Sequence, residues 1–256
     1  MSAARIIHTP EEIARIRRAA MITASVRDDL AAMARPGMTT FELDRLAGEL
    51  IARTGGTSAF KNYCGFPGNI CISVNDVVIH GIGREDVVLN EKDIVSIDVG
   101  VKFDGAIGDT ALTFGFTEQP TEIKNLMQGT QEALMEGIAA ARCGAFVHEI
   151  SAAVEKCARR HKLGIVREYV GHGCGIQLHE PPQVPNYTGS GKGPRLEPGM
   201  VLCIEPMLTS GSESVKLDRK DGWTVRTRDG KWSAHYEHMI LITEKEPEIL
   251  TWQKTM

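Results

Sequence analysis

The chain has 256 residues and a net charge of −4, a length that suits one large domain or two small fused domains with a sizeable core. The mildly acidic balance favours neither nucleic acid nor an anionic membrane as a partner. The sequence has no run of 18 apolar residues to span a bilayer, no apolar signal peptide within Met1–Glu12 and no CxxC pair among its six cysteines. We therefore expect a cytoplasmic protein with reduced cysteines.

Helix signals occur in two separate parts of the chain. Thr9 precedes Pro10, and Glu12 stands where a capping box needs it, so a helix is predicted to begin at Pro10. Apolar residues at helical spacing and helix-stop residues define the remaining boundaries. The predicted helices cover residues 10 to about 34, the segment between Thr39 and Gly55, residues 122 to about 142, and about 148 to 161.

The segment Asp93–Phe116 predicts a β-hairpin, because two β-rich runs flank the turn dipeptide Asp104-Gly105. A two-residue loop places Asp98 opposite Ala111, with Asp109 diagonally next to Asp98 on the same face. Burying two like charges is costly unless a positive partner offsets them, and Lys102 is the one cation in this segment. The hairpin therefore favours a divalent metal between the two acids. The alternative is a solvated strand face with both acids at the surface.

Further strands are predicted over residues 70–78, 200–209, 223–228 and 233–243. Alternation places Glu205 on the face of Val201 and Cys203, and it places Glu237 on the face of His235 and Met239. Both acids thus point where apolar residues point.

A histidine bracketed by glycines completes a candidate metal-binding set. The glycines of Gly171-His172-Gly173-Cys174-Gly175 would let a ligand or ion approach the backbone closely. Four carboxylates and one imidazole suit two divalent ions, and hard oxygen ligands with one nitrogen favour Mn, Fe, Co or Zn.

A short internal repeat relates the two parts of the chain. Ala32–Gly37 aligns with Ala139–Gly144 at a shift of 107 residues, and the same shift carries Asp98 onto Glu205. We expect a single catalytic domain over residues 1–256, made of two related halves (about 10–117 and 120–245) with the site at their seam. A chance match of helix-end residues is the alternative.

The segment YVGHGCGIQLHEPPQVPNY (Tyr169–Tyr187) resembles the signature region of type I methionine aminopeptidases, in their short bacterial subtype. Five residues match the metal ligands of that family one for one: Asp98, Asp109, His172, Glu205 and Glu237. The resemblance implies an α+β "pita-bread" fold, a curved antiparallel sheet with helices on its outer face, enclosing two divalent ions (Co, Mn, Fe or Zn). By the same resemblance Asp109 and Glu237 bridge the ions, Asp98 holds one ion, and His172 and Glu205 hold the other.

Two further histidines match residues that touch the substrate in this family. The resemblance implies that His80 contacts the substrate backbone beyond the scissile bond and that His179 hydrogen-bonds near the scissile carbonyl. Water between the two ions would lose its proton near neutral pH and attack the carbonyl, with His179 stabilising the oxyanion. Glu205 would pass the proton to the leaving amine. For His80 alone, the alternative is a cap on the turn before Gly81.

Six residues match the family's pocket for the methionine side chain: Phe60, Tyr63, Phe66, Cys71, Leu178 and Trp223. Some relatives carry Cys at the position of Phe60, Tyr at Phe66 and Phe at Leu178, so we expect an apolar pocket with a shifted outline. The alternative is that these are ordinary core residues.

The resemblance implies an enzyme that removes methionine from peptides and nascent proteins whose second residue is small. We expect it to act as a monomer, and a transient contact with the ribosome stays open. Two other interpretations are a proline-directed peptidase of the same fold, which usually carries an additional N-terminal domain, and a non-enzymatic binding module. The second would be expected to have lost ligands, whereas all five are present.

Overall fold

The computed structural model describes residues 7–189 and 191–252. The signal-peptide expectation rests in part on residues 1–6, which lie outside these ranges. Within the described part of the chain, no helix is both long enough and apolar enough to cross a membrane.

The described residues contain four α-helices, which confirm the four predicted helices to within two residues at each end: α1 (Pro10–Met33), α2 (Thr40–Arg53), α3 (Thr121–Ala140) and α4 (Val147–Arg160). At the start of α1, the Thr9 side chain accepts a hydrogen bond from the backbone N–H of Glu12, whose carboxylate accepts one from the backbone N–H of Thr9. Thr39 and Glu42 form the same capping box on α2. These caps satisfy backbone N–H groups that a helix start leaves without partners.

The predicted hairpin is confirmed in register as well as in type. Strand β4 (Ile94–Phe103) pairs with β5 (Ala106–Gly115), and both loop residues have positive φ, 50° at Asp104 and 71° at Gly105. This is the backbone of a two-residue hairpin turn. Asp98 faces Ala111 and Asp109 faces Gly100, so the two acids are diagonal neighbours.

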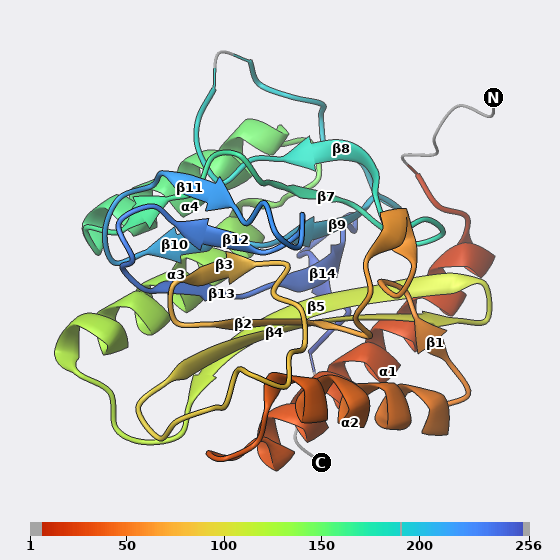
Figure 1. The fold of residues 1–256 in the computed structure, drawn as a ribbon. Helices are drawn as coiled ribbons and strands as arrows, with labels where there is room; N and C mark the ends of the chain where they lie inside the picture. Colours follow the sequence, from red (N-terminus) through yellow and green to blue (C-terminus); the bar gives the residue numbers. More distant parts are fainter. Residues whose placement is uncertain (1–6, 190, 253–256) are drawn as a thin grey trace.

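Helix α1 packs directly against the hairpin, and Figure 1 shows α1 and α2 running below it. A Cβ atom at Gly108 would lie 2.3 Å from Thr23 Oγ1 and 2.6 Å from the Ala19 carbonyl oxygen. Only glycine lets β5 approach the helix this closely. Arg18 of α1 also pairs with Asp104 in the turn, at 2.6 Å.

The single strand predicted over residues 70–78 is wrong, because the chain turns in its middle. It forms β2 (Cys71–Val74) and β3 (Val77–Ile79), separated at Asn75, whose φ is 54°. The Asn75 side chain donates to Asp93 and accepts from the backbone N–H of Ile94. Asn tolerates this left-handed conformation and bonds to nearby backbone, which makes it a turn residue here.

The long strands predicted over 200–209 and 233–243 are each broken in two. The first forms β9 (Val201–Ile204) and β10 (Met207–Thr209), and the second forms β13 (Ser233–His235) and β14 (His238–Leu241). β9 pairs with β14, and β10 pairs with β13. The segments 200–209 and 233–243 therefore both pass from one sheet to another at their breaks, which lie opposite each other. Glu205 and Glu237 lie in the two breaks, and Pro206, which has no N–H for a ladder, follows Glu205.

The remaining strands are short: β1 (Thr57–Ser58), β6 (Gly164–Ile165), β7 (Gly171–Gly173), β8 (Glu180–Val184), β11 (Val215–Leu217), β12 (Val225–Thr227) and β15 (Glu248–Ile249). All paired strands are antiparallel and form four sheets, ordered β1-β4-β2 with β5 on β4, β13-β10-β6, β11-β12-β3, and β15-β14-β9-β7-β8. The predicted antiparallel α+β fold is confirmed.

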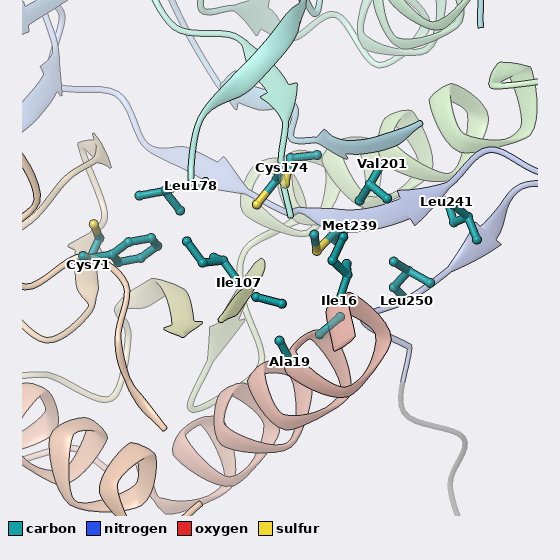
Figure 2. Packing of buried hydrophobic residues seen from close by; sticks show 14 of the residues in the cluster. Ile16, Ala19, Cys71, Ile107, Cys174, Leu178, Val201, Met239, Leu241 and Leu250 are labelled. Carbon is teal, nitrogen blue, oxygen red and sulfur yellow. The ribbon is translucent and has the colours of Figure 1, made fainter. Parts of the chain in front are cut away.

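The core between α1 and the strands joins residues from distant parts of the sequence. Figure 2 shows Ile16 and Ala19 of α1 pointing toward Met239 and Leu250, with Cys174 beside them. Cys71 and Leu178 lie at the other end of the same cluster (Figure 2). This cluster therefore packs against the cavity described next and holds its wall in place.

Candidate active site

One cavity of about 660 Å³ brings all the predicted site residues together. Its lining includes each of the following residues: Phe60, Tyr63, Phe66, Cys71, His80, Asp98, Asp109, His172, Leu178, His179, Glu205, Trp223 and Glu237. Apolar and aromatic side chains form one part of its wall, and the acids and histidines form another. A cavity with this division suits a ligand that has an apolar side chain next to a polar reacting group.

Asp109 and Glu237 are buried, Asp98 and Glu205 are largely buried, and there is not enough positive charge around the four acids to balance them. Within the described chain, Asp98 Oδ1, Asp109 Oδ1 and Glu237 Oε1 are buried oxygen atoms with no hydrogen-bond partner. Burial raises the pKa of Asp98 and of Glu205 to about 7, and it raises the pKa values of Asp109 and Glu237 well above their ordinary range. Such a group of unpaired buried oxygens is suited to hold cations.

His172 presents a ring nitrogen to these acids. Its Nδ1 lies 2.9 Å from the Gly173 carbonyl oxygen, which can only accept, so Nδ1 carries the proton in this hydrogen bond. The other ring nitrogen, Nε2, lies 3.4 Å from Glu205 Oε1 and 3.9 Å from Asp109 Oδ2. A neutral imidazole held by one nitrogen and open at the other is the usual state of a metal-binding histidine.

Hydrogen bonds to its backbone hold Glu237 in place. The backbone N–H of Glu237 donates to the Ala111 carbonyl at 2.9 Å, and Thr110 Oγ1 donates to the Glu237 carbonyl at 2.8 Å. Arg27 of α1 is buried and donates to Thr110 Oγ1 at 2.7 Å. The break that carries Glu237 is therefore tied to the hairpin that carries Asp109.

The two predicted substrate histidines face the cavity beside aromatic residues. His179 Nδ1 lies 2.8 Å from the Tyr63 hydroxyl, and its ring centroid lies 4.4 Å from that of His172. His80 lies edge-on to Tyr169 and has a φ of 57°, which is strained for a residue with a side chain. Burial lowers the pKa of His80 to about 4 and also lowers the pKa of His179, so both rings are neutral near pH 7.

The apolar end of the cavity is closely packed. Phe60, Phe66 and Leu178 are buried, and the ring of Phe66 lies edge-on to Trp223 with centroids 5.2 Å apart. A Cβ at Gly100 would lie 2.4 Å from the Phe60 ring, so glycine there makes room for this ring. Tyr63 differs from the others because it is exposed at the rim and bonds to His179.

His235 is a buried site residue to which the sequence assigned no role. Its side chain is 2% exposed, and its Nε2 lies 3.5 Å from Glu205 Oε2 with no hydrogen-bond partner among the described residues. Its alternation with Glu237 was the available signal, since both residues were expected on one strand face.

His8, before α1, contacts the loop that carries His179. Its Nε2 lies 3.0 Å from Glu180 Oε2, and both side chains are buried. Glu180 Oε1 accepts from the backbone N–H groups of Ile176 and Gln177. These bonds outweigh the opposing effect of burial and lower the pKa of Glu180, so its charged form secures this loop.

A larger cavity of about 880 Å³ lies between α1, β5 and α3 and includes none of the predicted site residues. Its acids already have partners, because Glu132 and Glu136 pair with Arg160 while Asp28 pairs with Arg27. The unpaired acids of the smaller cavity therefore make it the better candidate for chemistry.

Comparisons with known proteins agree with this choice. Residues 14–244 match the model of metallopeptidase family M24. The chain is 45% identical to methionine aminopeptidase 1 of Bacillus subtilis, over 96% of this chain and 98% of that relative. It is 40% identical to the methionine aminopeptidase of Escherichia coli K12, over 97% and 94%.

Solved structures give the same result. The methionine aminopeptidase of Thermotoga maritima superposes with a TM-score of 0.94 at 38% identity, over 98% of this chain and all of that one. The prolidase of Pyrococcus furiosus superposes with a TM-score of 0.78 at 22% identity, and the match covers 66% of its length. At that identity the second match shows a shared fold alone.

Proposed function

Because the chain belongs to metallopeptidase family M24, and within it to the methionine aminopeptidases, we propose that the 660 Å³ cavity is its active site. The enzyme is a metal-dependent hydrolase that removes the N-terminal methionine from peptides. One observation carries the assignment of the site: four buried or largely buried acids and one histidine converge on the cavity with too little positive charge around them.

Five residues would hold two divalent ions (Co, Mn, Fe or Zn) in this proposal: Asp98, Asp109, His172, Glu205 and Glu237. The donor set fits, because carboxylate oxygens and one imidazole are ligands that these ions share. Bound ions would supply Lewis acidity and lower the pKa of water in the site. The unpartnered oxygens of Asp109 and Glu237 are the chain's strongest sign that cations belong there.

Glu205 and His179 would handle the proton and the developing charge. Glu205 lies within reach of His172 and His235, where it can accept a proton from water and return it to the leaving amine. His179 would donate from Nε2 to the scissile carbonyl oxygen. For that, Nδ1 must accept a hydrogen bond, which the Tyr63 hydroxyl is placed to donate at 2.8 Å.

The apolar end of the cavity would hold the methionine side chain. Burying that side chain against Phe60, Phe66 and Trp223 would contribute about 1.5–3 kcal/mol. A difference of one methylene discriminates only about 10- to 200-fold, so we expect weak tolerance of norleucine and refusal of a charged first residue. His80 would contact the substrate backbone beyond the scissile bond, where we propose that the site admits only a small second residue.

We further propose that residues 1–256 form one catalytic domain of two related halves, about 10–117 and 120–245. The enzyme would work as a monomer in the cytoplasm on nascent chains, with a transient ribosome contact. All six cysteines are free, which supports a reducing compartment. Sedimentation of the purified enzyme, alone and with ribosomes, tests the oligomeric state and the contact.

A panel of N-terminal dipeptide sequences in otherwise identical peptides tests the function: Met-Ala, Met-Lys, Leu-Ala, Lys-Ala and Ala-Pro, each with Mn²⁺ or Co²⁺. We expect rapid cleavage of Met-Ala alone. Met-Lys tests the second position, and the other peptides test the first. Asp109→Asn, which keeps the shape of the side chain but removes a charge, is the matched inactive control. Rapid cleavage of Ala-Pro with no cleavage of Met-Ala would instead support the proline-directed alternative.

A further inference from the structure

We propose that Cys203 forms a second metal-binding site at the bottom of this cavity. This site would bind one thiophilic divalent cation such as Cd²⁺, and its occupation would prevent binding of the two ions proposed above. We call the four residues Asp109, His172, Cys203 and Glu237 the sulfur site. The inference rests on the proposed function, because three of these residues are shared with the ligand set proposed above.

The strand pairing places Cys203 beside His172. Cys203 lies on β9 directly opposite His172 on β7, so both side chains are on the same face of the sheet. One ligand atom from each residue of the sulfur site lies within 4.8 Å of the others. Cys203 is fully buried and does not line the cavity, which places its thiol just beneath the floor formed by the other three.

The donors match a tetrahedral thiophilic site. His172 Nε2 faces the acids, while Asp109 Oδ1 and Glu237 Oε1 are buried oxygens without hydrogen-bond partners in the described residues. With one sulfur they form a four-donor set of the kind that Zn²⁺ and related ions prefer. Bond lengths of about 2.0–2.3 Å put neighbouring ligand atoms about 3.5 Å apart, so ligand atoms that lie within 4.8 Å of one another would close by at most about 1.3 Å.

Binding would replace the Sγ–H bond of Cys203 by an Sγ–metal bond, with the proton passing to water in the cavity. The ion would use both acids that are proposed to bridge the dinuclear centre, leaving Asp98 and Glu205 outside its ligand set. Hard ions such as Mn²⁺ gain little from sulfur and would keep to the carboxylates. A thiophilic ion would therefore compete with Mn²⁺ for the same cavity.

Titration with Cd²⁺ tests the sulfur site, because a Cd²⁺–thiolate bond has an ultraviolet charge-transfer band. We expect the band in the unmodified chain and in Cys157→Ser, which removes the thiol of a separate group, Glu132, Cys157 and His161, that could also bind Cd²⁺; the variants below are therefore made in this Cys157→Ser chain. Cys203→Ser should lose the band. Its Cd²⁺ affinity should fall by more than the about 10- to 100-fold typical of losing a ligand's hydrogen-bond partner.

Cys174→Ser separates the two neighbouring thiols, since Cys174 lies within 4.8 Å of both His172 and Cys203. The band should persist in this variant. Its loss there with retention in Cys203→Ser would overturn the proposal, as would absence of the band from the unmodified chain at saturating Cd²⁺. If Cys203→Ser fails to fold, ¹¹³Cd NMR of the Cys157→Ser chain reports sulfur coordination directly, and a shift of all-oxygen or nitrogen type overturns it.

Mn²⁺ titration of the same samples separates this proposal from the proposed function. Tight Mn²⁺ binding without a Cd²⁺–sulfur band would refute the sulfur site and leave the function intact. Failure to bind Mn²⁺, together with inactivity on Met-Ala, would count against the proposed function itself.

Discussion

Removing divalent metal should make the stability of this protein fall as pH rises. In the metal-free chain, Asp98 and Glu205 are largely buried carboxyl groups whose pKa values are raised to about 7, from ordinary values of 3.8 and 4.5. Between those values and about 7, the folded chain binds more protons than the unfolded chain. The contribution of these two groups to the free energy of unfolding is therefore largest below pH 4 to 4.5. This contribution is lost as pH rises through 7.

The size of the effect follows from the same values. One proton contributes about 1.4 kcal/mol for each pH unit by which the pKa differs between folded and unfolded chains. For Asp98 the difference is about three pH units, or about 4 kcal/mol; for Glu205 it is about 3 kcal/mol. Each carboxyl group that is protonated only in the folded chain contributes up to about 1.4 kcal/mol per pH unit, and Asp109 and Glu237, whose pKa values are raised further, add to the slope of Asp98 and Glu205.

Urea unfolding of chelator-treated protein at several pH values between about 6.5 and 8 measures this slope, because at lower pH the histidines whose pKa values are lowered by burial contribute a slope of opposite sign. Asp98→Asn should flatten it by removing one titrating group, whereas Asp29→Asn, at an exposed position on α1, should not. Added Mn²⁺ should reverse its sign, because the ion competes with protons for the carboxylates and binds only the folded chain. A metal-free protein with pH-independent stability in this range would contradict the burial of unpaired acids.

Further outcomes are expected at individual residues. Asp109→Asn should lose Mn²⁺ affinity and activity together, as measured by calorimetry and turnover; retention of both would refute its role as a ligand. His179→Ala should keep Mn²⁺ binding but lower kcat by about 10²- to 10³-fold, and a parallel loss of metal would make it a ligand instead. His235→Gln should lower Mn²⁺ affinity by about 10- to 100-fold if it orients Glu205, and unchanged affinity would exclude that role. His8→Gln should lower kcat with Met-Ala while metal content stays constant, and an unaltered kcat would show that this contact does not position the loop.

The sequence was most informative where structure is local. The Asp104-Gly105 turn fixes the hairpin register, so the diagonal placement of Asp98 and Asp109 followed from two residues of turn chemistry. Helix caps at Thr9 and Thr39 likewise set helix starts to the residue. Alternation and the glycines around His172 indicated the candidates from the second half, and the resemblance to a known family implied which ion each residue would hold.

Long-range pairing accounts for what the sequence did not predict. Apolar alternation continues without interruption through Glu205 and Glu237, yet the chain leaves one sheet and joins another at both places. The change from one sheet to another depends on which distant strands pair with each segment. The alternation of apolar residues does not predict that pairing. The contact of His235 with Glu205 follows from the same crossing, which is why the sequence did not predict it.

The wide separation of the acids along the chain affects how the enzyme is made. Asp98 and Asp109 come together through one hairpin, whereas Glu237 lies 139 residues beyond Asp98. Local contacts form soonest, so a chain emerging during synthesis can bring the first two acids together long before Glu205 and Glu237 exist. Two carboxylates alone bind a metal ion only weakly. We therefore expect metal binding to follow the completion of β14. Metal supply would then act on finished molecules, as a maturation step separate from translation.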